Sequence, residues 1–208
     1  MRILIADDHS ILRQGLKRLL AEAIPNAEFG EAGSFTEALT LATSSDWDLV
    51  LADITMPGRS GLDLLKELKS LRPNLPVLVL SMHAEDQFAV RAIKAGAAGY
   101  LKKDCSPAEL VRAVNRAAAG GRYVSEALAE RLAVHLQSGG PNAPHEQLSD
   151  REFVVLRLIA SGKSMKEIAA ELGLSINTVN TYRARMLNKL DLKTNVELTR
   201  FAVDHELV

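Results

Sequence analysis

The sequence has few of the features that mark a disulfide-bonded, zinc-binding or membrane-spanning protein. A single cysteine, Cys105, among 208 residues excludes an intramolecular disulfide framework. The five histidines are scattered along the chain, and no group of Cys and His has the spacing of a structural zinc site. No apolar run is long enough to cross a bilayer, and no secretory signal pattern is present. We therefore expect a cytoplasmic protein without a membrane segment.

Strong charge of either sign is also absent. The formal net charge is −1, so the overall charge gives no indication of nucleic-acid binding. Residues 175–190, however, contain Arg183, Arg185 and Lys189 and no acid. A local basic helix of this kind is a candidate for binding phosphates. Hydrophobic residues make up 47% of the chain and charged residues 25%, which is typical of a globular protein.

The chain divides at a segment of small residues, glycine and proline. Residues 138–145 have no periodic apolar pattern, which predicts a linker that follows a helix over residues 126–136. We expect a first domain at residues 1–120, a linker region at 121–147 and a second domain at 148–208.

In the first domain, apolar strand-like runs alternate with amphipathic helical segments. The predicted strands are residues 3–6, 28–32, 49–52, 77–80 and 100–101, and the predicted helices are 11–22, 35–42, 62–71, 88–95 and 107–118. Near-continuous apolar strands separated by helices indicate a parallel sheet covered on both faces. The expected fold class is an α/β doubly wound five-stranded parallel sheet.

The second domain has the pattern of short helices alone. Three of them begin with a Ser or Thr that is followed three residues later by Glu, the signature of a capping box, at residues 149–152, 164–167 and 194–197. Leu148 and Phe153 are placed to form a hydrophobic staple around the first box. Gly173 can end one helix in a left-handed conformation, and Ser175 can cap the next. So short a connection predicts a small all-α helix-turn-helix domain.

Polar side chains follow the predicted strands, where ligands bind in a doubly wound sheet. They are Asp7, Asp8, Asp53, Ser81 and Lys103. Three neighbouring carboxylates need a cation, and an all-oxygen site suits Mg²⁺. A lysine and a hydroxyl at the same point could hold a phosphoryl group, with Asp53 as the nucleophile because it stands alone at its strand's end. Simpler alternatives stay open, since the Asp7–Asp8 pair could cap a helix and Asp53 could start the turn at residues 55–58.

Residues 1–120 resemble the receiver domain of two-component response regulators, which has a flavodoxin-like fold. The motifs that carry the resemblance are Ile5-Ala6-Asp7-Asp8-His9, Asp53-Ile54-Thr55-Met56-Pro57-Gly58-Arg59-Ser60-Gly61, Leu80-Ser81 and Gly99-Tyr100-Leu101-Lys102-Lys103-Asp104. The resemblance implies that Asp53 is phosphorylated by a sensor histidine kinase or a small phosphodonor. It also implies that Mg²⁺ is held by Asp8, Asp53 and the Thr55 backbone carbonyl, with Asp7 assisting through water or by contacting the residues that bind the ion.

The same resemblance implies a switch. The Ser81 hydroxyl would move towards the phosphoryl group and Tyr100 would turn inward behind it, although the residues alone allow Tyr100 to be an ordinary packed aromatic. Of the two adjacent lysines, the family pattern selects Lys103 as the active-site residue. Lys102 would then be a solvated neighbour.

Residues 175–190, set on a helix of 3.6 residues per turn, have one apolar and one polar side. The apolar side is predicted to pack inward and consists of Ile176, Val179, Met186, Leu187 and Leu190. The polar side can hydrogen-bond base edges or phosphates, although such a face taken alone could simply be solvated. The predicted DNA-binding residues are Lys166, Asn177, Thr178, Asn180, Thr181, Tyr182, Arg183, Ala184, Arg185 and Lys189.

Residues 148–208 resemble the LuxR-type helix-turn-helix domain of NarL/FixJ-type response regulators. The residues that carry the resemblance are Leu148-Ser149-Asp150-Arg151-Glu152, Val155-Leu156, 162–169, Leu172-Gly173, 175–179 and 187–190. The resemblance implies a transcription regulator that reads double-stranded promoter DNA with the helix at 175–190, as a homodimer formed on activation. Phe153, Asn180 and Ala184 depart from the usual residues, which leaves the preferred DNA sequence open.

Two other functions are weighed against this one. Haloacid-dehalogenase-like phosphatases also use an aspartate nucleophile with Mg²⁺, but they need a second Asp where this chain has Thr55. A receiver that acts without phosphate is disfavoured by the complete set of acid, hydroxyl and lysine. The sequence therefore favours a phosphorylation-controlled DNA-binding transcription regulator, and not an enzyme.

Overall fold

The computed structural model describes residues 1–56, 59–82, 87–137, 144–205 and 207–208. They form two compact units, Met1–Leu136 and Gln137–Val208. Among the described residues, no helix is both long enough and apolar enough to cross a membrane. Pro57 and Gly58 of the predicted turn, and residues 138–143 of the predicted linker, lie outside the described residues.

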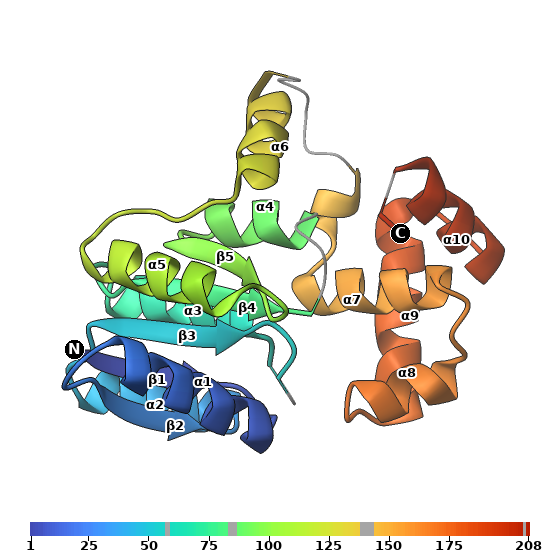
Figure 1. Cartoon of the computed structure of the whole chain (residues 1–208). Coiled ribbons are helices and arrows are strands. Elements are labelled where there is room, and N and C mark those ends of the chain that lie inside the picture. Colours follow the sequence, from blue (N-terminus) through green and yellow to red (C-terminus); the bar gives the residue numbers. More distant parts are fainter. Residues whose placement is uncertain (57–58, 83–86, 138–143, 206) are drawn as a thin grey trace. The chain divides into compact units, whose positions relative to one another are not determined.

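The first unit is a five-stranded parallel sheet with helices on both faces (Figure 1). The strands are β1 (Arg2–Ala6), β2 (Glu28–Ala32), β3 (Leu49–Asp53), β4 (Val77–Ser81) and β5 (Gly99–Lys102), in the spatial order β2-β1-β3-β4-β5. The helices are α1 (Ser10–Ala23), α2 (Phe35–Ser44), α3 (Gly61–Leu71), α4 (Gln87–Lys94), α5 (Pro107–Ala118) and α6 (Glu126–Gln137). The predicted fold class is confirmed.

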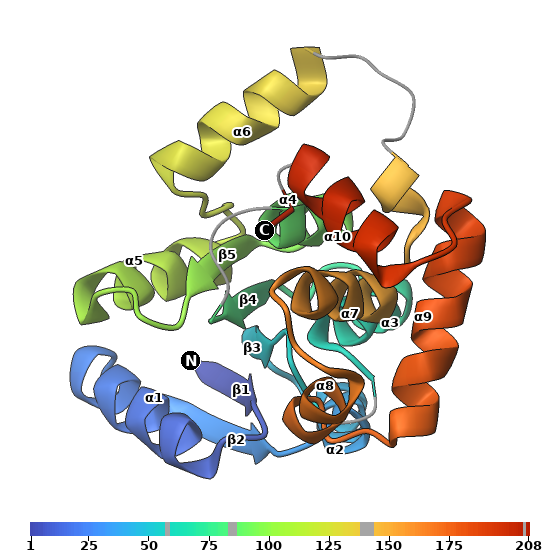
Figure 2. The same ribbon diagram turned by 90° about the vertical axis from the view of Figure 1, so that its right-hand side faces the viewer.

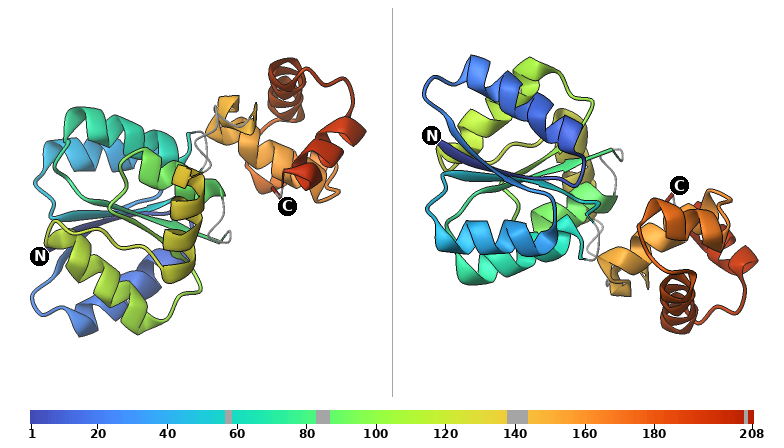
Figure 3. Two further views of the ribbon diagram at one scale, coloured as in Figure 1. Left: turned by 90° about the horizontal axis from the view of Figure 1, so that it is seen from above. Right: turned by 90° about the horizontal axis from the view of Figure 1, so that it is seen from below.

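Helices can cover both faces of the sheet because β3 and β4 are apolar up to their last residues, Asp53 and Ser81. All residues of β3 and β4 are buried. Helices α1 and α5 lie on one face of the sheet and α2, α3 and α4 on the other, as the edge-on view in Figure 3 shows. This two-sided burial explains why these strands read as continuous apolar runs rather than as alternating patterns.

The chain after α5 extends the sheet at its β5 edge. The Tyr123 amide donates to the Ala98 carbonyl over 2.8 Å, and Tyr123 forms a parallel bridge with Gly99. A Cβ on Gly99 would lie 2.4 Å from the Tyr123 carbonyl oxygen, so this close approach requires glycine. The Tyr123 hydroxyl also hydrogen-bonds Glu109 Oε1 of α5 at 3.1 Å. The segment that leads into α6 is thus fixed to the sheet.

The second unit is all-helical (Figure 2). It consists of the 3₁₀ helix η1 (Pro144–Gln147), α7 (Asp150–Ala160), α8 (Met165–Glu171), α9 (Ile176–Leu190) and α10 (Asn195–Asp204). Pro144 and His145 therefore belong to η1 and not to an irregular linker, which corrects the prediction at that end. The reason is packing, because His145 is buried with its ring centroid 6.2 Å from that of Phe153.

The helix starts of the second unit follow the predicted capping chemistry in two of three cases. Ser149 with Glu152, and Ser164 with Glu167, form reciprocal capping boxes. At α10 the Thr194 side chain accepts from the Glu197 amide, but the Glu197 carboxylate accepts from the amide of Lys193, one residue earlier than a box requires. Leu148 and Phe153, the predicted staple residues, are both buried.

The connection between α8 and α9 is as short as the sequence predicted. Gly173 adopts a φ of +63°, a left-handed conformation that glycine enters without strain. Ser175 is the N-cap of α9 and accepts a hydrogen bond from the Thr178 amide over 3.0 Å. The two helices therefore form a helix-turn-helix.

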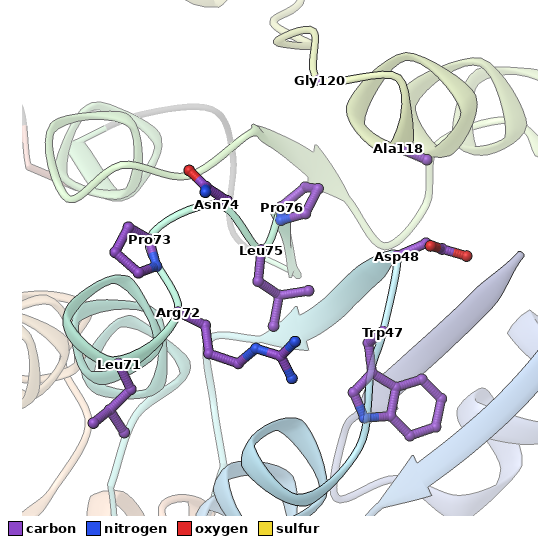
Figure 4. A pocket seen from close by; sticks show the side chains of 10 residues that line it. All are labelled: Trp47, Asp48, Leu71, Arg72, Pro73, Asn74, Leu75, Pro76, Ala118 and Gly120. Carbon is purple, nitrogen blue, oxygen red and sulfur yellow. The ribbon is translucent and has the colours of Figure 1, made fainter.

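A hollow of about 490 Å³ lies at the amino-terminal edge of the sheet (Figure 4). It is lined by Trp47, Arg72 and eight neighbouring residues. The Arg72 guanidinium donates to the carbonyls of Ala42 and Ser45 around the end of α2, so this charge is already engaged. None of the predicted site residues lies here, and the hollow does not mark the functional site.

Candidate functional sites

The predicted acids meet at the carboxyl edge of the sheet. Asp7 follows β1 and Asp53 ends β3, and these two strands are neighbours. Ligand atoms of Asp7, Asp8, His9 and Asp53 lie within 4.8 Å of one another. Asp7 and Asp53 are almost fully buried, whereas 28% of the Asp8 side chain is exposed. An oxygen-rich cluster that is open on one side fits a hard divalent cation that keeps several waters.

Lys103 provides a positive charge between two of these acids. Its Nζ lies 2.7 Å from Asp7 Oδ2 and 2.8 Å from Asp53 Oδ2, and only 4% of its side chain is exposed. The Lys103 amide donates to the Ser81 carbonyl over 2.8 Å, which continues the pairing of β5 with β4 beyond the strand end. This backbone bond holds Lys103 at the edge of the sheet where the acids lie.

The electrostatics of Asp53 are set by burial and by its neighbours. Burial raises the pKa of Asp53 to about 6, and Asp7 adds to the rise, while Lys103 and a backbone hydrogen bond from Thr55 oppose it. Burial lowers the pKa of Lys103, but the carboxylates of Asp53 and Asp7 outweigh burial and raise it above its usual range. At neutral pH the lysine is therefore charged and Asp53 is a carboxylate available as a nucleophile.

His9 is a residue of this cluster to which the sequence analysis gave no role. Its amide donates to Asp7 Oδ1 over 2.8 Å, and its Nδ1 lies 3.2 Å from Asp7 Oδ1 and 2.9 Å from Asp8 Oδ1. His9 is also the N-cap residue of α1. The alternative that Asp7 and Asp8 merely cap the helix is therefore wrong. The position of His9 directly after Asp7 and Asp8 in the sequence could have indicated that it belongs to this cluster.

Three further predicted residues lie in strands β4 and β5 or just after β3. Ser81 ends β4 and is fully buried, and Tyr100 is fully buried within β5. Thr55 follows β3 and is only partly buried. Its amide is the group that hydrogen-bonds Asp53. The structure thus brings the acid, hydroxyl and lysine residues to the ends of neighbouring strands.

Helix α9 presents most of its predicted polar face to solvent. Exposed residues are Asn177, Asn180, Thr181, Ala184, Arg185 and Asn188, while Thr178 is partly buried. Lys166 is exposed on α8. Val179, Met186 and Leu187 are buried as predicted. Ile176 is an exception, because it is 46% exposed at the first turn of the helix.

Two basic residues of α9 are engaged within the second unit. Lys189 Nζ lies 2.7 Å from Glu152 Oε2 and donates to the Gln147 carbonyl over 3.1 Å. Arg183 donates to the Asn195 side chain and, like Tyr182, is partly buried. Of the predicted basic contacts, Lys166 and Arg185 are exposed and form no ion pair with any residue that the structure describes, whereas Lys189 is exposed but paired with Glu152.

This fold and its cluster define a class of protein. A parallel sheet of order 2-1-3-4-5 with buried acids and a lysine at its carboxyl edge, joined to a helix-turn-helix unit, has the parts of a response regulator with a DNA-binding output domain. Residues 3–115 match the response regulator receiver domain, and residues 146–202 match the bacterial regulatory proteins of the luxR family. The chain belongs to the response regulators of the NarL/FixJ type, which are transcription regulators and not enzymes.

Relatives are similar over the full length. The response regulator GacA of Pseudomonas viridiflava is 38% identical over 209 residues, which cover 100% of this chain and 98% of that protein. The response regulator UvrY of Escherichia coli K12 is 33% identical over 100% of this chain and 95% of that protein.

Solved structures show the same likeness. A complex of the response regulator RcsB with DNA is 27% identical, with a TM-score of 0.60 and 98% of each chain covered. RcsB from Salmonella enterica serovar Typhimurium, bound to promoter P1flhDC in the presence of the phosphomimetic BeF₃⁻, is 28% identical with a TM-score of 0.60 and 97% of each chain covered.

Proposed function

We propose that this protein is a transcription regulator whose DNA binding is controlled by phosphorylation of Asp53. The observation that carries the proposal is the Lys103 ammonium, 2.8 Å from Asp53 and 2.7 Å from Asp7 at the carboxyl edge of the sheet. A cation in that place is positioned to neutralise a phosphoryl group on Asp53. Membership of the response regulators supports the proposal.

In the proposed reaction, a carboxylate oxygen of Asp53 attacks the phosphorus of a phosphohistidine on a sensor kinase or of a small phosphodonor. The new bond is an acyl phosphate, and the electron pair of the broken bond leaves with the donor. Mg²⁺ would be held by Asp8, Asp53 and the Thr55 backbone carbonyl, with Asp7 acting through water, and would neutralise phosphoryl oxygens. The donor set of the cluster fits this ion, because the ligand atoms of the acids lie within 4.8 Å of one another.

The proposed switch uses the residues beside Asp53. The phosphoryl oxygens offer Lys103 and Ser81 a new partner, which favours one arrangement of the loops after β4 and β5, with Tyr100 turned inward. A shift from a rare to a dominant state needs only about 5 kcal/mol of differential stabilisation, which a few charge-assisted hydrogen bonds supply. We propose that this state dimerises in the cytoplasm, with the receiver at residues 1–120, the linker region at 121–147 and the output domain at 148–208.

The proposed DNA interface is the exposed face of α9 with Lys166 of α8. Amides, a hydroxyl and a guanidinium on this face can reach base edges, and small Ala184 allows a close approach to the major groove. Tyr182, Arg183 and Lys189 are proposed backbone contacts, although Lys189 already pairs with Glu152. The RcsB structures with DNA, which are similar to this chain, support the interface.

The proposal is tested on the intact chain with acetyl phosphate and Mg²⁺. We expect a covalent phosphoryl adduct, seen by mass spectrometry, that is absent in Asp53→Asn and present in the matched variant Asp104→Asn, whose acid is exposed outside the cluster. Beryllofluoride should raise affinity for selected promoter oligonucleotides in the native chain and not in Asp53→Asn. An adduct that persists in Asp53→Asn, or multiple-turnover hydrolysis of a phosphate ester, would contradict the proposal.

A further inference from the structure

An apolar cavity of about 250 Å³ lies in the first unit, lined from α1, β4, β5 and the start of α5. Its walls are mainly aliphatic and include Leu12, Leu16, Leu19, Leu80, Pro107 and Leu110. This volume lies between the roughly 150 Å³ of an apolar cavity that binds benzene and the roughly 300 Å³ at which pockets for drug-sized ligands begin. The cavity therefore suits a small ligand with an apolar chain.

Gly15 lines the cavity from an exposed position of α1. It lies in the middle of α1, where glycine weakens a helix relative to alanine. A Cβ on Gly15 would meet nothing within 4 Å, and its φ is not positive, so neither packing nor backbone conformation requires glycine here. Leu12 and Leu19 lie one turn before and after it on the same side of the helix. The missing side chain leaves space between them.

The charged groups of the lining are two lysines. Lys103 is paired with Asp7 and Asp53, whereas Lys102 forms no ion pair with any residue that the structure describes. Cys105, the remaining polar residue of the lining, is half-buried, and burial raises the pKa of its thiol so that it stays neutral. A lysine without a paired acid at an aliphatic cavity complements an anionic head group.

We propose that this cavity binds a medium-chain aliphatic carboxylate, with its hydrocarbon chain between the leucines of α1 and α5 and its carboxylate at Lys102. A chain of about eight carbons matches the size of the cavity. The site does not depend on the proposed phosphorylation, although Lys103 lines both places. Binding is expected in the unphosphorylated chain.

The single cysteine provides a local probe of this site. Cys105 lines the cavity, so its rate of reaction with a neutral maleimide reports on occupancy. Octanoate should slow this reaction in a saturable manner, and the concentration needed should fall about fourfold for each methylene added from butanoate to octanoate. Octylamine, which has the same chain and a cationic head, should protect at least about tenfold more weakly because Lys102 repels it.

Two pairs of variants test the assignment. Gly15→Leu should fill the cavity and abolish protection by octanoate, while Gly15→Ala should retain it. Lys102→Gln should weaken protection by octanoate about fivefold, while Lys66→Gln, on α3 at the other face of the sheet, should leave it unchanged. Circular dichroism checks the fold of each variant. If Gly15→Leu does not fold, the lysine pair and the chain-length series decide.

Three results would overturn the proposed binding of a carboxylate in this cavity. Absence of protection by octanoate in the native chain overturns the proposal, and so does equal protection by octanoate and octylamine. A Gly15→Leu variant with altered self-association, in a chain that octanoate does not protect, would assign the cavity to a second copy of the protein.

Discussion

The Lys103 ammonium lies 2.8 Å from Asp53 Oδ2, and both side chains are almost completely buried. The lysine offsets part of the repulsion between Asp53 and Asp7, whose carboxylates it bridges. In the proposed function, the same ammonium would neutralise a phosphoryl group on Asp53. Stability and reactivity of this unit therefore depend on the same charge.

Lys103→Met should make the fold depend on a metal ion. Removing one partner of a buried ion pair is strongly destabilising, and we expect a loss of about 3 kcal/mol without metal, at the low end because Asp53 can take up a proton. The pKa of Asp53 should rise further above about 6, since burial and Asp7 remain. Thermal unfolding should show a larger stabilisation by Mg²⁺ in Lys103→Met than in the native chain or in Lys102→Met. Equal Mg²⁺ effects in all three would contradict this role for Lys103.

Asp53→Asn should be more stable than the native chain at pH 7 in the absence of metal. The pKa of Asp53 rises on folding from 3.8 to about 6, so its stabilising protonation is fully present below about pH 3.8 and lost as pH rises through 6. The difference corresponds to about 3 kcal/mol at pH 7, and Asn avoids it because it cannot ionise. Urea unfolding from pH 4 to pH 8 should show the advantage of Asp53→Asn disappearing towards pH 4. Asp104→Asn, whose acid is exposed, should show no such trend.

The same pKa shift predicts the pH dependence of phosphorylation. A protonated Asp53 is a poor nucleophile, so the initial rate with acetyl phosphate and saturating Mg²⁺ should fall as the pH drops below about 6. Bound metal would lower the midpoint, which makes about 6 an upper value. A rate that increases on acidification would rule out the ionised carboxylate as the reacting form.

Removing Lys166 should change DNA binding, whereas removing Lys189 should change the stability of the second unit. Lys166 is exposed, so Lys166→Ala should reduce the slope of log affinity for DNA against log salt by about one unit and leave stability unchanged. Lys189 is bound to Glu152 and the Gln147 carbonyl, so Lys189→Ala should lower the unfolding free energy of the second unit by about 1 kcal/mol. Fluorescence anisotropy over a salt series and urea unfolding separate the two effects. Identical changes in the salt slope would show that Lys189 contacts DNA as well.

Substituting alanine for Gly99 and for Gly15 should change the free energy of unfolding in opposite directions. Gly99→Ala places a Cβ 2.4 Å from the Tyr123 carbonyl oxygen and 2.8 Å from Leu78 Cδ2, so we expect a loss of about 1–3 kcal/mol. Gly15→Ala meets nothing and should stabilise α1 by about 0.5–1 kcal/mol. Urea unfolding measures both, and a neutral Gly99→Ala would mean that Tyr123 is not held against β5.

The sequence predicted the strands and the meeting of the acids because both follow from short-range rules. Apolar runs identify buried strands, and the carboxyl ends of parallel strands share one edge, so Asp7 and Asp53 had to lie near each other. The position of Lys103 between Asp7 and Asp53 does not follow from such a short-range rule. It depends on the Ser81–Lys103 backbone bond, which continues a strand pairing past the end of the apolar pattern.

Other features depend on contacts between distant residues. Lys189 was predicted as a phosphate contact, but Glu152, 37 positions away, holds its ammonium. A helical wheel places Ile176 on the apolar side of α9, yet periodicity cannot show whether a neighbouring helix reaches the first turn. The local composition placed His145 in a linker. Composition cannot predict its contact with the ring of Phe153, which lies eight positions later in the chain.

The pairing of Tyr123 with Gly99 affects where the first unit can be cut. A fragment that stops at residue 120 would leave the outer side of β5 without its backbone partner and present unpaired amide and carbonyl groups. Such an edge invites association with other chains. An isolated first unit that includes Tyr123 and its hydrogen bond to Glu109 would keep that edge protected and remain dispersed in solution.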